Sequence, residues 1–300
     1  MDFFDKASSV IDQGVNAAYG AVSDALVQQA DFVQKFIRLC DEGWKQGWHE
    51  RNGGNLTYRL TDEEVEEFSK HFTKESEWVN MGVSSKLLAG SYFLTTGSGR
   101  YMSNVKSNPS YNIGIVEIND EGDSWRIVWG LDDGGKPTSE FPTHFMNHVV
   151  RVKATDGACR LIYHAHPANI IAMTSVCPLE SRYFTRALWK AMTECVVIFP
   201  CGVGVVPWMV PGGAEIAKAT SELMEKYDAA VWAQHGLFVS GEDFDSTFGL
   251  MHTIEKAAEI YRLSRQMNAG SDEFLNTITD DNLRQIGKDF NLVINEEFLD

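Results

Sequence analysis

The sequence lacks the features that mark membrane and secreted proteins. No apolar run approaches the roughly 20 residues that a membrane-spanning helix requires. Its first residues, MDFFDKASSVIDQ, have neither the basic start nor the continuous apolar stretch of a signal peptide. We therefore predict a cytoplasmic globular protein that does not act at a membrane.

Basic residues are in short supply. The chain has 26 Lys and Arg against 42 Asp and Glu, which gives a formal net charge of −16. A chain this acidic has no general attraction for nucleic acid or anionic lipid, so we expect neither as a partner. A phosphorylated ligand would have to be held by local dipoles, a few cations or a metal ion.

Cysteine is scarce, and the cysteines show no paired spacing. There are five cysteines, an odd number, and no C-x-x-C motif. This pattern argues against a disulfide framework and against a sulfur-rich zinc site. We predict that all five are small apolar side chains in a reducing compartment. They are Cys40, Cys159, Cys177, Cys195 and Cys201.

The common nucleotide and nucleophile motifs are also missing. The glycines at 97–99 are not followed by a third glycine at Met102, and those at 202–204 meet Pro207 where a glycine is required. There is no P-loop lysine and no G-x-S-x-G. The sequence therefore disfavours a dinucleotide-dependent dehydrogenase.

What is present predicts an α/β protein. Helical and strand patterns alternate, and Asn119–Asp123 is a good turn between two strand patterns. That hairpin excludes a purely parallel sheet, so we expect a three-layer α/β/α sandwich around a mixed, largely antiparallel sheet. The predicted strands are 56–60, 91–96, 112–118, 124–130, 161–167, 195–200 and 229–236. The predicted helices are 32–47, 142–153, a stretch from 168, 182–192, 214–227 and most of the C-terminal third.

The first part of the chain reads as a separate helical segment. Apolar residues at steps of three and four over 1–30 define one helical face, although Gly14 and Gly20 weaken the helix. This N-terminal extension either packs on its own core or contacts a partner, and its role is open. With no repeat and no linker further on, we predict that 31–300 form a single domain.

Three histidines form the strongest candidate site. His164 and His166 alternate along the predicted strand 161–167, so both imidazoles point to the same face. His235 ends another predicted strand, where loops build sites in α/β proteins. Three imidazoles with a fourth position left open are typical of catalytic zinc. Two same-face imidazoles near an apolar core are costly without a ligand, which favours a metal for the first pair.

A second histidine pair offers an alternative. His144 and His148 lie at i and i+4 of the predicted helix 142–153, a spacing that can also hold zinc. No glutamate follows His144, and an amphipathic helix supplies such pairs by chance. A surface or packing role is therefore favoured for this pair.

One carboxylate and two glycine-containing loops complete the candidates. Glu140 lies between Pro137 and Pro142. It is either a general base with a raised pKa or an acidic residue that stabilises the start of a helix. The loops 52–55 and 95–100 either present backbone N–H groups to an oxyanion or are ordinary turns.

Taken together, these residues resemble the class II aldolase/adducin family from about residue 32 to the C-terminus. The resemblance rests on an ordered set of phrases rather than on one short motif. The phrases are GWHERNGGNLTYRL (47–60), FLTTGSGR (93–100), WGLDDGGKPTSEFPTHF (129–145), YHAHPANIIAMT (163–174), TECVVIFPCGVGVVPWMVPG (193–212) and QHG (234–236).

The resemblance implies a catalytic domain over 31–300 and a role for each matched residue. His164, His166 and His235 would bind one Zn²⁺ per subunit. Glu140 would be the catalytic acid/base, and Glu194 would reach the active site of a neighbouring subunit in a homotetramer whose sites lie near subunit interfaces. The residues around the substrate phosphate would be Asn52, Gly54, Asn55, Ser98, Gly99 and Ser139.

The implied reaction is the zinc-dependent cleavage of a small phosphorylated ketose. Breaking the C3–C4 bond of a 2-ketose 1-phosphate leaves negative charge next to the C2 carbonyl, which a Lewis acid stabilises. A Schiff base would instead need a desolvated lysine in the site, and these motifs do not indicate one. Two rivals remain: an epimerase or aldolase for another sugar phosphate, and a non-catalytic scaffold such as the adducin head.

Overall fold

The computed structural model describes residues 18–74 and 76–300. The chain separates into two compact units that alternate along the sequence. Unit 1 consists of Met1–Asp41 and Tyr58–Thr138, and unit 2 consists of Glu42–Thr57 and Ser139–Asp300. The chain passes from one unit to the other within α2 (Asp31–Lys45), within β1 (Asn55–Arg59) and after Thr138.

Unit 1 is built on four antiparallel strands in the order β2-β5-β4-β3. Their bounds are Val79–Asn80 for β2, Tyr92–Thr96 for β3, Ile113–Ile118 for β4 and Ser124–Gly130 for β5. The helices of unit 1 besides α2 are α3 (Asp62–Phe68), α4 (Met102–Val105), α5 (Pro109–Asn112), η1 (Ser69–His71) and η2 (Lys86–Leu88).

The predicted hairpin of unit 1 is confirmed. β4 and β5 pair antiparallel, and the side-chain oxygen of Asn119 accepts hydrogen bonds from the backbone N–H groups of Asp123 and Ser124 at 3.0 and 3.2 Å. Gly122 takes a φ of 70° in this turn, a conformation that favours glycine. A local turn signal was therefore sufficient to predict the pairing.

The described part of the N-terminal segment, 18–29, is helical and packs on unit 1. Tyr19 Oη donates to the Lys70 carbonyl oxygen at 3.3 Å, and Val27 is fully buried. Val22 and Ala25 belong to the apolar face predicted from the sequence, but both are exposed, so the helix contacts unit 1 through a different face. Residues 1–17 of the predicted extension lie outside the described residues.

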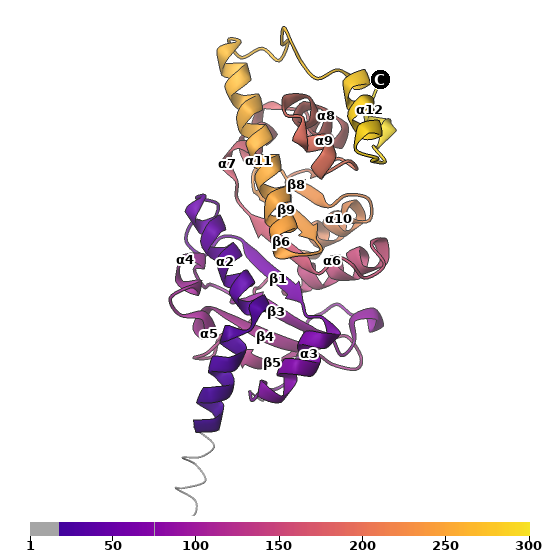
Figure 1. Ribbon diagram of the computed structural model, residues 1–300. Coiled ribbons are helices and arrows are strands. Elements are labelled where there is room, and N and C mark those ends of the chain that lie inside the picture. Colours follow the sequence, from indigo (N-terminus) through magenta and orange to yellow (C-terminus); the bar gives the residue numbers. More distant parts are fainter. Residues whose placement is uncertain (1–17, 75) are drawn as a thin grey trace, which may run out of the picture. The chain divides into compact units, whose positions relative to one another are not determined.

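Unit 2 contains a mixed sheet in the order β6-β9-β8-β7 (Figure 1). β6–β9 and β8–β9 are antiparallel, whereas β7–β8 is parallel. The strands are β6 (Leu161–Ala165), β7 (Gly204–Val206), β8 (Ala229–Trp232) and β9 (Gly236–Gly241). The helices are α6 (Phe141–Ala154), α7 (Ala168–Val176), α8 (Ser181–Ala191), α9 (Glu194–Ile198), α10 (Ala214–Met224), α11 (Phe244–Met267), α12 (Asp280–Asp289) and η3 (Glu296–Phe298).

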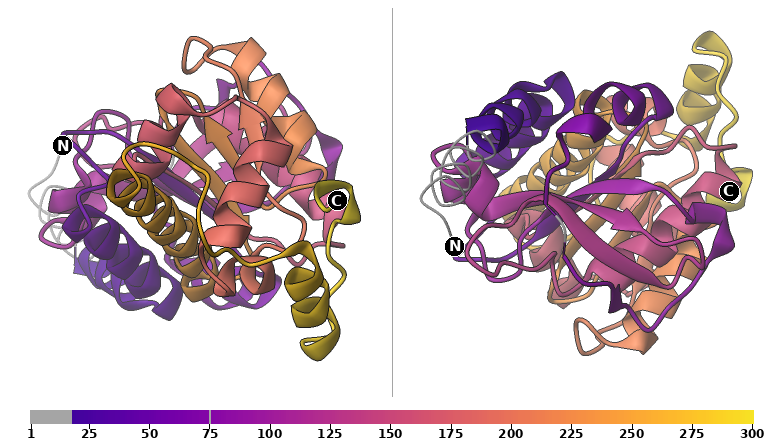
Figure 2. Two further views of the ribbon diagram at one scale, coloured as in Figure 1. Left: turned by 90° about the horizontal axis from the view of Figure 1, so that it is seen from above. Right: turned by 90° about the horizontal axis from the view of Figure 1, so that it is seen from below.

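Helices cover both faces of this sheet. The long helix α11 lies on one side of β6 and β9, and α6 with α10 lies on the other (Figures 1 and 2). Ile162 of β6 belongs to a buried cluster with Trp232, Phe238 and Ile216 of α10, whose apolar contact holds the second layer. The predicted α/β class, with helices on both sides of a mixed sheet, is confirmed.

Two predicted strands differ from the structure. The segment 195–200 is largely helical, in α9, because Cys195, Val196 and Phe199 are buried at helical spacing. A short β-branched apolar run does not distinguish a strand from a buried helix. The strand predicted over 229–236 ends at Trp232, and His235 lies in the turn that joins β8 to β9.

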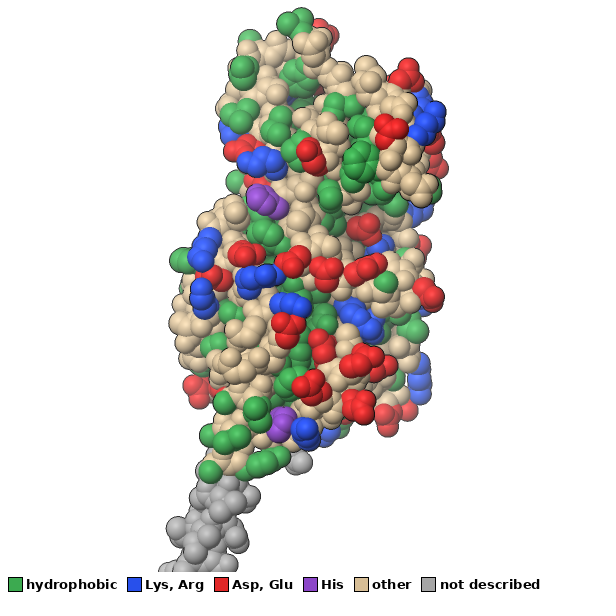
Figure 3. Space-filling view, in the orientation of Figure 1, with side chains coloured by type: hydrophobic (Ala, Val, Ile, Leu, Met, Phe, Trp, Pro, Cys, Tyr) green, Lys and Arg blue, Asp and Glu red, His purple; other side chains and the backbone are tan. Residues whose placement is uncertain are grey.

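The acidic surface and the free thiols match what the charge and the cysteine pattern of the sequence predict. Acidic side chains gather on the face over α3 (Figure 3), whose first turn holds Asp62, Glu63 and Glu64. All five cysteines are free thiols; four are buried and Cys201 is partly exposed. Among the described residues, no helix combines the length and the apolar character that crossing a bilayer requires.

Candidate active site

The three histidines predicted as metal ligands meet at one point of unit 2. His164 lies on β6, His166 follows directly after it, and His235 lies in the turn between β8 and β9. Each offers a ring nitrogen, and these atoms lie within 4.8 Å of one another. His164 Nε2 is 3.3 Å from His166 Nε2 and 3.3 Å from His235 Nε2. The antiparallel pairing of β6 with β9 brings together residues that are 71 positions apart.

The hydrogen bonds on the far side of two rings decide where their protons lie. His164 Nδ1 is 3.1 Å from the Leu237 carbonyl oxygen, and His166 Nδ1 is 2.7 Å from Glu50 Oε1. Carbonyl and carboxylate oxygens accept hydrogen bonds, so both Nδ1 atoms carry the proton and donate it. In a neutral imidazole Nε2 then has a lone pair, and the lone pairs of His164 and His166 face each other.

This arrangement fits a metal ion. Two lone pairs at a separation of 3.3 Å repel each other unless a cation lies between them. Nitrogens bound at ~2.0–2.1 Å to one tetrahedral zinc ion are themselves about 3.3 Å apart. Burial and the neighbouring imidazoles also hold the pKa of His164 well below its usual range, so this ring stays neutral. Burial likewise lowers the pKa of His235 to about 4.

Glu140 stands at the start of α6, in the same unit. Its Oε2 accepts a hydrogen bond from Asn55 Nδ2 at 2.7 Å. Burial raises the pKa of the Glu140 carboxyl, while the Asn55 bond and the nearby His166 oppose that rise. A partly desolvated carboxyl that can exist in either protonation state suits general acid/base chemistry.

The turn before β1 is packed directly against the histidine strand. Gly54 has a φ of 75°, and a Cβ there would lie 2.5 Å from His49 Nδ1 and 2.7 Å from the His164 carbonyl oxygen. His49 bonds to Gly53 O at 3.0 Å and to Tyr163 Oη at 2.8 Å. Glycine is therefore required at this position by conformation and by space.

Two residues of this arrangement were not singled out from the sequence. Glu50 fixes the His166 ring, and the buried His49 joins the glycine turn to Tyr163 on β6. Both lie in the phrase HERNGGN, but only the tertiary structure places their side chains against β6.

The other predicted site residues lie on exposed segments. Ser139 precedes Glu140 and is exposed, as is Glu194, the first residue of α9. Asn52 is exposed in the turn before β1. Ser98 and Gly99 are exposed in unit 1, in the turn that follows β3. Unit 2 therefore holds every predicted site residue except these last two.

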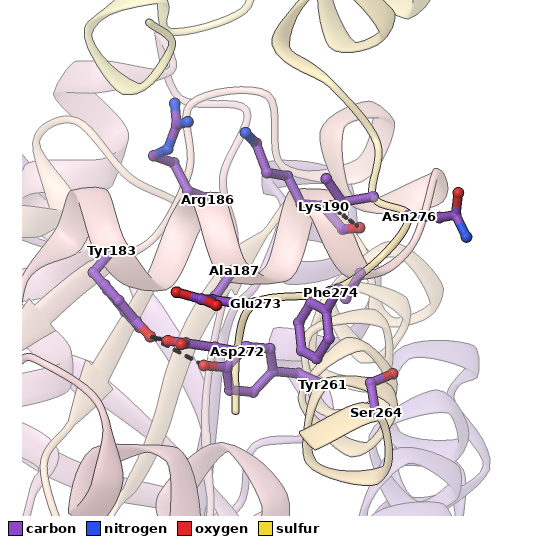
Figure 4. A pocket seen from close by; sticks show the side chains of 12 residues that line it. Tyr183, Arg186, Ala187, Lys190, Tyr261, Ser264, Asp272, Glu273, Phe274 and Asn276 are labelled. Carbon is purple, nitrogen blue, oxygen red and sulfur yellow. Dashed lines mark hydrogen bonds between the residues drawn. The ribbon is translucent and has the colours of Figure 1, made fainter. Parts of the chain in front are cut away.

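A cavity elsewhere in unit 2 offers different chemistry. It has a volume of about 570 Å³ and lies between α8, the end of α11 and the segment 272–277 (Figure 4). Tyr183 Oη, which lines it, donates to Asp272 at 2.8 Å, and Lys190 pairs with Asp280 at 2.7 Å. Among the described residues, the three histidines are the one group of three or more potential metal ligands that converge. We therefore place the candidate active site at the histidines.

The fold and this site define the class of the protein. The chain belongs to the class II aldolase/adducin family, since 34–262 match the model of the class II aldolase and adducin N-terminal domain. The resemblance that the sequence phrases carried is thereby confirmed. Members of this family generally use a divalent metal ion.

The relatives that match most of the chain include enzymes named rhamnulose-1-phosphate aldolase. The chain is 43% identical to the rhamnulose-1-phosphate aldolase of Klebsiella pneumoniae subsp. pneumoniae over 87% of its own length and 93% of that protein. It is 42% identical to the rhamnulose-1-phosphate aldolase of Escherichia coli K12 over 88% of its length and 95% of that protein.

Solved structures agree on the fold. The chain is similar to the sugar-phosphate aldolase from Thermotoga maritima, with a TM-score of 0.68 and 27% identity over 81% of this chain and 97% of the other. An L-fuculose 1-phosphate aldolase matches with a TM-score of 0.57 and 18% identity over 88% and 98%, which shows the shared fold.

Proposed function

We propose that this chain is a zinc-dependent aldolase of rhamnose catabolism, which cleaves L-rhamnulose 1-phosphate into dihydroxyacetone phosphate and L-lactaldehyde. The observation that carries the proposal is the convergence of three imidazoles in the same unit as a half-buried glutamate. The identity of 43% to an enzyme named for this substrate supports the choice of sugar.

The reaction needs two functions from the protein. When the C3–C4 bond breaks, the C4 hydroxyl passes its proton to solvent and becomes the aldehyde oxygen, and the electron pair of the broken bond remains at C3 beside the C2 carbonyl. A divalent ion held by His164, His166 and His235 would supply Lewis-acid stabilisation of that charge. Glu140 then gives a proton to C3 and releases dihydroxyacetone phosphate, and in synthesis it removes the same proton.

The remaining residues bind the substrate. The backbone at Asn52 and Gly54, with Ser139, would hold the phosphate through N–H and hydroxyl groups, as would Ser98 and Gly99. The Asn55 side chain already bonds Glu140 and His144, so it would contact phosphate by exchanging one of these bonds. A site built from neutral donors suits a chain with a net charge of −16.

The metal, the assembly and the location belong to the same proposal. Three imidazoles suit zinc. We propose a homotetramer in which the exposed Glu194 reaches the active site of a neighbouring subunit, and a cytoplasmic enzyme with one Zn²⁺ per subunit. The exposure of Glu194 at the start of α9 supports a contact outside its own unit.

Release of dihydroxyacetone phosphate from L-rhamnulose 1-phosphate tests the proposal. We expect cleavage that disappears on chelation and returns when zinc is added back. An isomeric sugar phosphate with no free aldehyde would instead indicate an epimerase. A protein that retains no zinc and cleaves nothing would indicate a non-catalytic scaffold.

A further inference from the structure

The second histidine pair of unit 2 is buried and belongs to a hydrogen-bond chain. His144 and His148 of α6 are both fully buried, with no exposed surface. Both rings face the hydroxyl of Thr57 on β1, which is 2.9 Å from His144 Nδ1 and 2.8 Å from His148 Nε2. The i and i+4 spacing of this pair therefore serves a shared hydroxyl.

The chain of bonds continues from His144 to the candidate acid/base. His144 Nε2 is hydrogen-bonded to Asn55 Oδ1, and Asn55 Nδ2 bonds to Glu140 Oε2 at 2.7 Å. Thr57 and Asn55 are two residues apart on β1, so both side chains point to the same face of the strand, toward α6. Helix α6 and strand β1 thus supply alternate members of one hydrogen-bond chain that ends at Glu140.

When Glu140 is ionised, each bond of the hydrogen-bond chain has one possible direction. An ionised Glu140 only accepts, so Asn55 must turn its NH₂ toward it and its carbonyl oxygen toward His144. His144 must then donate from Nε2. Burial keeps this ring neutral, with a pKa of about 3, so its Nδ1 has no proton and accepts from Thr57. The single Thr57 proton is then used, so His148 Nε2 donates to the Thr57 oxygen.

We propose that Thr57, His144 and His148 are positioning residues that fix the orientation of the Asn55 amide and, through it, the Glu140 carboxyl. The hydrogen-bond chain presents a donor to Glu140 and not an acceptor. If the amide were reversed, its carbonyl oxygen would face the carboxylate and the two would repel each other. This inference rests on the proposed role of Glu140 in catalysis.

Thr57→Val tests the hydrogen-bond chain, because valine has the shape of threonine without the hydroxyl. We expect kcat to fall by about 10-fold to 10²-fold, since a small misplacement of a catalytic group has effects of this size. The metal content should stay close to wild type, because the substitution removes no proposed metal ligand. Thr57→Ser restores the hydroxyl and should recover most of kcat.

Thr185→Val is the matched control. Thr185 is also fully buried in unit 2 and accepts a hydrogen bond from the Val203 N–H at 3.0 Å, but it lies on α8 outside the hydrogen-bond chain. We expect an unchanged kcat for this variant when the folded fraction is taken into account. An equal fall in kcat for both threonine variants, or a wild-type kcat for Thr57→Val, would overturn the proposal.

A second measurement is independent of activity. With ¹⁵N-labelled histidine in the full-length protein, the ring signals should assign the proton to Nε2 in both His144 and His148. A proton on Nδ1 of His144 would overturn the proposal, even if Thr57→Val does not fold. If the wild type does not cleave the sugar phosphate, the proposed function fails, and the ring signals still decide the direction of the hydrogen bonds.

Discussion

Unit 2 contains two groups of histidines that differ in what lies between their facing ring nitrogens. The nitrogens of His164 and His166 that face each other are 3.3 Å apart and carry lone pairs, because their other nitrogens donate to oxygen. His144 and His148 face one hydroxyl, which donates to the first and accepts from the second. The facing nitrogens of the first group need a cation between them, whereas those of the second are both hydrogen-bonded to the Thr57 hydroxyl.

The difference shows that spacing alone does not define a metal site. Both H-x-H on a strand and H-x-x-x-H on a helix place two imidazoles on one face. Whether such a pair can bind a metal depends on the hydrogen-bond partner of each ring nitrogen. An acceptor oxygen behind each ring turns the lone pairs of His164 and His166 toward each other, whereas the Thr57 hydroxyl is hydrogen-bonded to both facing nitrogens of His144 and His148 and leaves no lone pair between these two rings.

The largest effect is expected for His164→Ala. This change removes the most deeply buried of the three proposed ligands, and metal content should fall from about one ion per chain to near zero. Turnover should fall by about 10³-fold or more, since a Lewis acid contributes several kcal/mol. Metal analysis and the cleavage assay measure both quantities. His71→Gln, at a half-buried histidine of unit 1, should keep both, and metal retention by His164→Ala would contradict the assignment.

Glu140→Gln should separate acid/base chemistry from metal binding. The amide cannot exchange a proton with C3, so kcat should fall by about 10²- to 10⁴-fold while zinc is retained. Steady-state kinetics with parallel metal analysis test this, and Glu225→Gln at an exposed position serves as control. A near-normal kcat would remove Glu140 from the proposed mechanism.

A smaller effect is expected for Glu50→Gln. The carboxylate accepts from His166 Nδ1 at 2.7 Å and thereby directs the Nε2 lone pair toward the other two rings. Loss of such a partner typically lowers metal affinity by about 10- to 100-fold. Competition with a chelator measures the affinity. Unchanged zinc affinity would show that the strand alone orients His166.

The smallest effect concerns stability in mild acid. Burial lowers the pKa of His144 to about 3 and that of His49 to about 4, so near pH 5.5 the unfolded chain binds protons at these rings that the folded chain does not. Stability should therefore fall as the pH drops from 6.5 toward these values, by about 1 kcal/mol per ring between pH 6.5 and 5.5.

Denaturant unfolding at pH 6.5 and 5.5 checks this loss, with His49→Asn and His144→Asn as comparisons. Each variant should lose less stability on acidification than the wild type, because asparagine does not titrate. An identical pH dependence in wild type and variants would show that these rings bind protons in the folded state.

Turn motifs and the alternation of side chains along a strand correctly predicted the elements that depend on neighbouring residues. Asn119–Asp123 is a turn in both the sequence and the structure, and β6 carries His164 as its alternation required. The segment 195–200 was predicted wrongly, because its β-branched residues fit a strand by propensity while burial at helical spacing decided for α9. Propensity is a preference of about 1 kcal/mol, which packing readily exceeds.

The sequence by itself determined the family, the excess of acidic residues, the free state of the cysteines and the residue types of the site. Only the tertiary structure decided that His49 and Glu50 hold the glycine turn and His166, and that Thr57 separates His144 from His148. The physical reason is that a neutral imidazole has one proton for two nitrogens. The atom that is hydrogen-bonded to Nδ1 decides which of the two nitrogens carries that proton. In this chain those atoms come from residues that lie 73, 116 and 87 positions away, for His164, His166 and His144.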